Sequence, residues 1–219
     1  ETVVQPLMTA FSSESGDRME PFVFLLRGTP GVGKSTVMDP ICVEALKILQ
    51  PDGLDFGNDF NLNHYIYCKN GDSPYYDGYR NQPIYKKDEM FQKQDVKGAQ
   101  VSEASDFIAM INSAPFPLNM ANLGDKGATY FRSPFFIGTT NIIGKIQGLE
   151  SIREVDAVNR RIKFSVVVTI KEKYQYGPDA TGNSLSQSLN RRHPDVIASE
   201  SRGEFFTGCY EFQLRDEVS

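Results

Sequence analysis

The residues best suited to chemistry lie in a short glycine-rich stretch, GTPGVGKS, at positions 28–35. Its pattern is G-x-x-x-x-G-K-[ST], in which glycines let backbone N–H groups converge on phosphate oxygens at the start of a helix. Lys34 brings a compact positive charge to the β- and γ-phosphates, and the hydroxyl of Ser35 can ligate Mg²⁺. A glycine-rich turn that matches by chance is the alternative. We expect ATP and Mg²⁺ as cofactors, with the nucleotide held by Gly28, Thr29, Pro30, Gly31, Val32, Gly33, Lys34, Ser35 and Thr36.

An acidic pair, Asp88 and Glu89, is the next candidate. An aspartate at a strand end can hold Mg²⁺ with Ser35, and the adjacent glutamate can polarise the attacking water. The alternative is an exposed acidic pair in a loop. Lys86 and Lys87 favour that alternative, because they stand where a buried strand should be apolar. We rank the catalytic interpretation higher, because a phosphate-binding loop needs such a partner.

The stretch FFIGTTN, residues 135–141, begins as a buried strand and ends in small polar residues. Asn141 at that end could hydrogen-bond the attacking water or a γ-phosphate oxygen and so sense whether the phosphate is present. Thr139 and Thr140 would help to set the strand end. The alternative is a strand that runs into an ordinary turn.

Two arginines, Arg160 and Arg161, stand directly ahead of another apolar stretch. A guanidinium group can neutralise charge on a transferring phosphoryl group, as an arginine finger does. If the finger acts on a neighbouring subunit's nucleotide, the protein must assemble as a ring. From this motif alone, a pair of surface salt-bridging arginines would be the preferred interpretation.

These candidates need a sheet to position them. Short apolar or β-branched runs predict five strands, and apolar residues at helical spacing predict a helix over 35–49, kinked or shifted by Pro40, and another over 104–114. The alternation predicts a three-layer αβα P-loop NTPase fold, AAA+-like, whose central, mostly parallel five-stranded sheet has helices on both faces. We expect an N-terminal extension (1–20), an ATPase core (21–175) and a C-terminal segment packed on the core (176–219). The predicted strands are 22–26, 64–68, 82–85, 135–140 and 162–170.

The bulk properties narrow the class of protein. The chain has 219 residues and a net charge of −5, which argues against a uniformly basic nucleic-acid-binding surface but not against a local basic channel. No apolar run reaches the roughly 20 residues of a membrane-spanning helix. Three separated cysteines and two histidines disfavour a zinc site and suit a reducing compartment. The chain begins with Glu1, so we expect a fragment or a processed product.

In order, these motifs resemble the superfamily 3 helicases of picornavirus-like RNA viruses, the 2C-type ATPases. The resemblance spans residues 22–170. The stretch YYDGYRNQPIYKKDEMFQ is similar to the family's acidic-pair segment, and NSAPFPLNMANLGDKGATYFRSPFFIGTTN resembles the segment that leads to its sensor asparagine. The stretch AVNRRIKF matches the family's arginine pair. The matching residues around the acidic pair are Asp77, Gly78, Tyr79, Gln82 and Gln92.

The resemblance implies an ATP-hydrolysing motor that forms a hexameric ring and unwinds or remodels single-stranded RNA in viral genome replication. Asp88 would position Mg²⁺, Glu89 would activate water, Asn141 would be the sensor, and Arg160 and Arg161 would act in trans. Lys126 would lie on a loop facing the central pore, where a cation could follow an RNA backbone, although a solvated lysine explains it equally well.

The resemblance also implies other viral replication proteins as partners and a place in the host cytoplasm at membrane-associated replication complexes. The family's cysteine-rich zinc segment and membrane-binding helix are not visible, so membrane contact would come only through segments outside this chain.

Other functions remain open. The chain could be a nucleotide-dependent scaffold or RNA chaperone without processive unwinding, or the helicase domain of a DNA-virus replication initiator. The sensor-like Asn141 and the late arginine pair argue against a small-molecule phosphotransferase.

Overall fold

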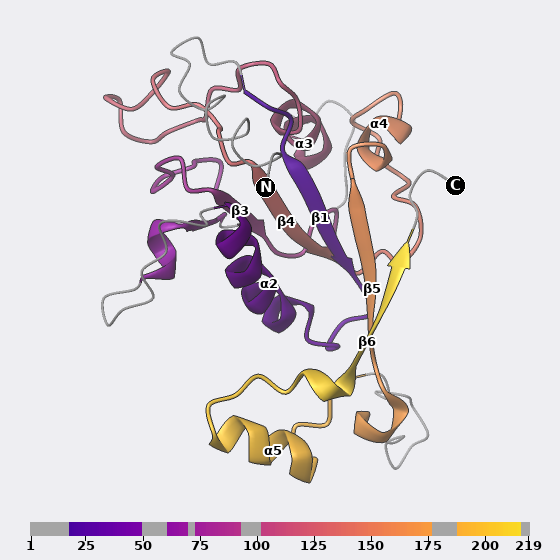
Figure 1. Cartoon of the computed structure of the whole chain (residues 1–219). Helices are drawn as coiled ribbons and strands as arrows, with labels where there is room; N and C mark the ends of the chain where they lie inside the picture. Colours follow the sequence, from indigo (N-terminus) through magenta and orange to yellow (C-terminus); the bar gives the residue numbers. More distant parts are fainter. Residues whose placement is uncertain (1–17, 50–60, 70–72, 93–101, 177–187, 216–219) are drawn as a thin grey trace.

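The computed structural model describes residues 18–49, 61–69, 73–92, 102–176 and 188–215. Its centre is a six-stranded sheet with the order β2-β3-β4-β1-β5-β6 (Figure 1). All neighbouring strands are parallel except β6, which runs antiparallel to β5. The strands are β1 (Phe22–Arg27), β2 (Ile66–Cys68), β3 (Ile84–Lys87), β4 (Phe135–Thr140), β5 (Phe164–Ile170) and β6 (Tyr210–Arg215).

Four α-helices accompany the sheet in the described part of the chain. They are α2 (Lys34–Leu49), α3 (Glu103–Met110), α4 (Asp156–Asn159) and α5 (Pro194–Ser201). Short 3₁₀ turns, η2 (Leu62–His64), η3 (Glu172–Tyr174) and η4 (Thr207–Cys209), complete the elements. Layers of helix on both faces of a mostly parallel sheet confirm the predicted three-layer α/β P-loop NTPase fold.

The helix α2 covers one face of the sheet. Its buried side chains include Val37, Met38, Cys42 and Leu46, and they share one apolar cluster with strand residues such as Ile137. Pro40 lies inside α2 without ending it, and the helix begins at Lys34, one residue ahead of the predicted start. Burial of Met38 and Cys42, two residues before and after Pro40, offsets the lost backbone hydrogen bond.

The opposite face is aromatic and is covered by α3 and α4. Phe136 of β4 stacks on Tyr85 of β3 at a centroid distance of 4.8 Å, and Phe107 of α3 meets Phe136 edge-on at 5.5 Å. Val158 of α4 joins the same cluster. Because successive strand residues point to opposite faces, β1 contributes Val23 and Leu25 here and the intervening residues to the α2 side.

The two lysines that interrupted the predicted strand lie at the end of β3, which runs through them. Lys86 forms an ion pair with Asp39 of α2, and Lys87 pairs with Glu103 of α3 at 2.7 Å. Since neighbouring strand residues point to opposite faces, each lysine meets a carboxylate from a different helix layer. These pairs explain how two cations are accommodated at a largely buried strand.

The sixth strand is a difference from the five that the sequence predicted. The segment YEFQLR pairs antiparallel along β5, from Ile170↔Tyr210 to Ser165↔Arg215. Only its first residue is buried, and Phe212 and Leu214 remain 53% and 63% exposed. The burial that usually marks a strand is therefore weak.

No helix among the described residues is long and apolar enough to cross a membrane.

The centre of the sheet should dominate stability. Ile137 of β4 is fully buried, so Ile137→Ala should lower the free energy of unfolding by about 2–5 kcal/mol, because a cavity remains where the side chain was. Ile48 on α2 is 66% exposed, and Ile48→Ala should change the free energy by no more than about 0.5 kcal/mol. Chemical denaturation of both variants measures the difference; similar losses would contradict the assigned burial.

Candidate functional site

The candidate site lies where the parallel strands have their carboxyl ends, and this side of the sheet is called its edge below. The strands β1, β3 and β4 are parallel, and Arg27 and Lys87 pair with Thr140 and Gly138 near their carboxyl ends. The glycine-rich loop (residues 28–35) follows β1, the acidic pair follows β3, and Asn141 follows β4. In Figure 1 the chain turns from β1 into α2 at the lower edge of the sheet. Three separate stretches of sequence thus meet, as parallel pairing requires.

Lys34 joins the glycine-rich loop to β4. Its Nζ donates to the carbonyl oxygens of Gly28 at 2.8 Å and Thr29 at 3.0 Å, and to Oδ1 of Asn141 at 2.7 Å. Burial lowers the pKa of Lys34, while the charges of Asp88 and Glu89 act to raise it. The ammonium group is therefore fixed between the loop and the predicted sensor, with two carboxylates nearby.

Asp88 is held by donors from two other elements. The hydroxyl of Ser35 donates to its Oδ2 at 2.6 Å, and the hydroxyl of Thr139 donates to its Oδ1. The backbone N–H of Glu89 also donates to Oδ1, at 3.1 Å. A serine hydroxyl beside a carboxylate offers the oxygen ligands that Mg²⁺ prefers, so Ser35 and Asp88 fit the predicted metal site.

Glu89 has an unusual backbone. Its φ is 53°, in the left-handed region that residues other than glycine rarely adopt, and its side chain is exposed. The conformation is held by the Glu89 N–H, which donates to the Thr139 hydroxyl at 3.0 Å, and by the Met90 N–H, which donates to the Thr139 carbonyl at 2.7 Å. Such strain persists where the surroundings fix it, and it gathers at functional sites.

Gln92 links the turn that carries Asp88 and Glu89, called the acidic turn below, to the predicted sensor Asn141. Its Nε2 donates to the Thr140 hydroxyl at 3.2 Å, and its Oε1 accepts from Nδ2 of Asn141 at 3.2 Å. The Thr140 hydroxyl in turn donates to the Met90 carbonyl at 2.8 Å. The polar end of β4 thus binds the acidic turn, a role beyond the expectation that Thr139 and Thr140 would help to set the strand end.

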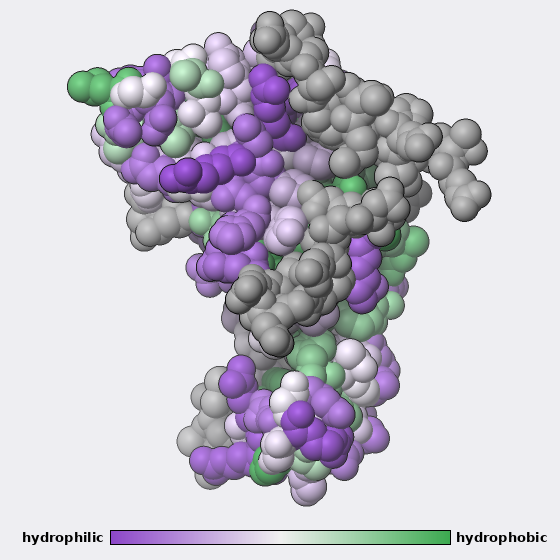
Figure 2. Space-filling model, turned by 60° about the vertical axis from the view of Figure 1, so that its left-hand side comes forward, coloured by the Kyte–Doolittle hydropathy of each residue, from purple (hydrophilic) through white to green (hydrophobic). Residues whose placement is uncertain are grey.

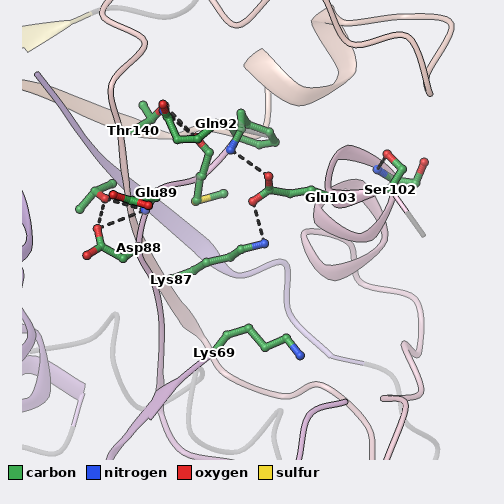
Figure 3. Close-up of polar contacts among 12 residues, drawn as sticks. Lys69, Lys87, Asp88, Glu89, Gln92, Ser102, Glu103 and Thr140 are labelled. Carbon is green, nitrogen blue, oxygen red and sulfur yellow. Dashed lines mark hydrogen bonds and ion pairs between the residues drawn. The ribbon is translucent and has the colours of Figure 1, made fainter. Parts of the chain in front are cut away.

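Glu103 supports the same turn from behind and was not predicted. It pairs with Lys87 through one carboxylate oxygen and accepts from the Phe91 N–H at 2.9 Å through the other (Figure 3). It lies in the first turn of α3, where an acidic residue also suits the helix dipole. It lies one residue ahead of the helix predicted over 104–114, and nothing in the sequence connects it to residue 91.

Gly138 explains how the acidic turn can lie so close to β4. A Cβ built on Gly138 would overlap the sulfur of Met90 and approach the Lys87 carbonyl to 3.3 Å. The glycine in FFIGTTN therefore makes room for the residue that follows the acidic pair. In the sequence analysis this position is predicted only as part of a buried strand.

The arginine pair is not brought to this edge. Arg160 and Arg161 follow α4 and precede β5, so they lie near the amino ends of the parallel strands, opposite the glycine-rich loop (Figure 1). Arg161 donates to the carbonyl oxygens of Ile111 at 2.9 Å and Ala157 at 2.8 Å, whereas Arg160 is exposed. Burial, with the Arg160 charge, lowers the pKa of Arg161.

Lys126 is also far from the glycine-rich loop. It is exposed in a turn-rich loop between α3 and β4, next to Gly127 with φ of 79°. A β-bridge between Pro117 and Tyr130 closes the base of this loop. The upper part of the face in Figure 2 is mostly hydrophilic. A polar cavity of about 480 Å³ adjoins the loop, and its lining includes Arg80 and Arg132.

Comparison with known proteins assigns the chain to a family. Residues 24–142, which include the glycine-rich loop, the acidic pair and Asn141, match the RNA helicase family. The chain belongs to the RNA helicase family. The match ends before α4, so the arginine pair lies beyond it.

Relatives of this helicase domain occur in viral polyproteins. It is 32% identical over 207 residues to the replicase polyprotein of Drosophila C virus. The aligned region covers 93% of this chain and 11% of that polyprotein. It is 32% identical to the replicase polyprotein of Acute bee paralysis virus (72% of this chain, 8% of the polyprotein). It is 33% identical to the genome polyprotein of Human klassevirus 1 (72% and 6%). The domain is therefore a superfamily 3 viral helicase, as its motifs predicted, and spans about a tenth or less of these polyproteins.

Gly138→Ala tests how tightly the acidic turn packs on β4. Overlap with the buried Met90 side chain should lower the free energy of unfolding by about 1–3 kcal/mol, because an overpacked contact must shift its neighbours. Gly144→Ala is the matched control, because nothing lies within 4 Å of its Cβ position. Thermal unfolding compares the two, and a Gly138→Ala protein as stable as the control would show that this approach is not tight.

Proposed function

We propose that the chain binds ATP with Mg²⁺, hydrolyses it, and uses that cycle to unwind or remodel single-stranded RNA during replication of a positive-strand RNA virus. The observation that supports this most directly is the convergence of Lys34, the Ser35–Asp88 pair and Asn141 at one sheet edge. A chance glycine-rich turn would have no reason to meet a carboxylate from β3 and an amide from β4.

In the proposed reaction the loop backbone and Lys34 bind the phosphates. Ser35 and Asp88 would hold Mg²⁺, which would supply positive charge to offset that of the phosphates. Glu89, exposed beside Lys34, takes a proton from the attacking water, and Asn141 orients that water or a γ-phosphate oxygen. Thr139 keeps Asp88 and Glu89 near Lys34. Its hydroxyl bonds both acidic residues, and its carbonyl accepts from the N–H of the next residue, Met90.

The position of the arginine pair favours action on a neighbouring subunit. Arg160 and Arg161 lie at the opposite edge from their own glycine-rich loop. In a head-to-tail ring, this edge of one subunit faces the nucleotide edge of the next. We propose a ring on this basis, hexameric as the family resemblance implies, with Arg160 as the exposed finger and Arg161 anchored through backbone carbonyls.

The RNA contact is proposed for the loop that carries Lys126. Lys126 is exposed, and the cavity beside it is lined by Arg80 and Arg132 together with Asp125, so cations outnumber carboxylates here although the chain as a whole is acidic. Lysine and arginine side chains bind an RNA backbone through its phosphates. We place this activity in the host cytoplasm, with other viral replication proteins as partners and membrane contact only through segments outside this chain.

Lys34→Ala tests the nucleotide site. Loss of the ammonium group should reduce ATP turnover by at least about 10²-fold, because a preorganised charge at the transferring phosphate is lost. Lys47→Ala is the control, since Lys47 lies on the same helix and pairs with the exposed Glu44. Turnover is measured by phosphate release. Near-normal turnover by the Lys34→Ala protein would remove the glycine-rich loop from the mechanism.

Mixing of subunits tests the arginines. A protein carrying Arg160→Ala, which spares the carbonyl contacts of Arg161, should lose activity by about 10³-fold if Arg160 is a finger. Mixed with Lys34→Ala subunits, it should regain part of the turnover, because an intact site and an intact finger then meet across an interface. Lys163→Ala, an exposed neighbour, should keep full activity. Absence of recovery at every ratio would contradict action in trans.

A further inference from the structure

The stretch that follows Asn141, residues 142–146, is held by side chains from other elements. It is neither helix nor strand, so it takes no part in the backbone bonding of the sheet. Its backbone groups are instead bonded by two arginines, from β1 and β6, and by an asparagine from α4. Backbone groups outside helices and strands need such partners wherever they are shielded from water.

Arg27 supplies most of these bonds. It ends β1 and is fully buried. Its Nη1 donates to the carbonyl oxygens of Ile142 and Gly144, both at 2.8 Å, and its Nε donates to the Ser165 hydroxyl on β5 at 2.6 Å. A guanidinium group carries its N–H donors in a rigid fork, so it can bond several acceptors at fixed relative positions. A lysine ammonium on its flexible stem cannot reproduce that fork.

Arg215, at the end of β6, bonds the residue between those two. Its Nη1 donates to the Ile143 carbonyl at 2.6 Å. The strands β1 and β5 lie between β4 and β6, so this bond joins β6 to the chain that leaves β4 (Figure 1). Arg215 also pairs with Ser165 along β5, and Ser165 accepts from Arg27. The carbonyls of residues 142–144 are therefore all held by one cluster around the two guanidinium groups.

The two ends of the stretch are fixed as well. At its start, the Ile142 N–H donates to the Thr140 hydroxyl at 3.3 Å. At its far end, the buried side chain of Asn159 accepts from the Ile146 N–H at 3.0 Å and donates to the Ile146 carbonyl at 3.1 Å. The backbone that continues from the predicted sensor is thus anchored at its start, middle and end.

The position of the Asn141 amide depends on this anchoring. Its Oδ1 accepts from Lys34 at 2.7 Å and its Nδ2 donates to Gln92 at 3.2 Å. The pairing of β4 with β1 ends one residue earlier, at Thr140. Beyond that residue, the bonds to residues 142–144 direct the backbone in place of the sheet. Such positions matter, because a displacement of about 1 Å can cost about 10²-fold in rate.

We propose that Arg27 and Arg215 are positioning residues for the sensor: they fix residues 142–144 and thereby the Asn141 amide at the γ-phosphate. In this role both arginines act through Asn141 and not on the nucleotide. The proposal rests on the proposed function, because Asn141 must take part in ATP hydrolysis. It gives β6, the strand that the sequence did not predict, a contribution to activity.

Arg215→Ala is the first test, because Arg215 is half-buried at the end of an outer strand and its loss should leave the fold intact. The kcat for ATP should fall by about threefold to tenfold, while KM and the affinity for a non-hydrolysable ATP analogue stay unchanged, since the glycine-rich loop still binds the phosphates. Arg215→Lys keeps a donor for the Ile143 carbonyl and should restore most of the rate. Gln213→Ala, at an exposed position of the same strand, should change neither kcat nor KM.

Combination with Asn141→Ala separates a positioning role from a general weakening of the structure. If Arg215 acts through Asn141, Arg215→Ala should slow the Asn141→Ala protein no further. Arg27→Lys provides a second variant. It loses the fork and should lower kcat by about tenfold or more, again with no further loss in the Asn141→Ala protein.

Rate losses that multiply in the double variants would overturn the proposal, as would a raised KM with unchanged kcat. A folded Arg215→Ala protein that keeps the wild-type rate would also reject it. If Asn141→Ala keeps the wild-type rate, the sensor role fails and this proposal fails with it, although the nucleotide site can still stand on the Lys34→Ala result. Wild-type protein without any ATP turnover would reject the proposed function itself.

Discussion

The parallel alignment of β3, β4 and β1 is the constraint on which the candidate site depends. Parallel strands place their carboxyl ends at the same edge, and here each of those ends supplies a different group. Lys34, Asp88 and Asn141 are far apart in the chain yet are joined by direct hydrogen bonds or by one intervening residue. A shift of β4 by one residue would turn Thr139 to the other face and break both contacts that hold Asp88 and Glu89.

The two helix layers support this edge through different forces. The buried residues on the α2 side are mostly aliphatic, and α2 begins at Lys34 itself, so packing of Met38 and Leu46 also fixes the start of the helix. The α3 side is packed with aromatic rings. Beside them, Glu103 forms an ion pair with Lys87 and accepts a hydrogen bond from the Phe91 N–H. The acidic turn is therefore held from β4 in front and from α3 behind, which allows Glu89 to keep a strained backbone.

Much of this could be predicted from local sequence because the deciding signals are local. Glycine spacing in the loop, and the apolar runs of β1, β4 and β5, report their own conformation. Other features depend on contacts between distant residues. Gly138 matters because of Met90, Glu103 matters because of Phe91, and β6 pairs although only Tyr210 is buried. The arginine pair and Lys126 carry clear motifs, yet a single subunit does not bring them to the loop, so their roles stay predictions.

The two outer strands of the sheet, β2 and β6, have features that disfavour pairing with a strand from another copy of the chain. β2 at one end has three residues, and β6 at the other alternates Glu211, Gln213 and Arg215 with its apolar residues. A very short edge strand and an edge strand with charged side chains both disfavour the addition of a strand from another chain. In the proposed ring, copies of this chain would thereby be kept from joining sheet to sheet, and they would remain available to associate through other surfaces.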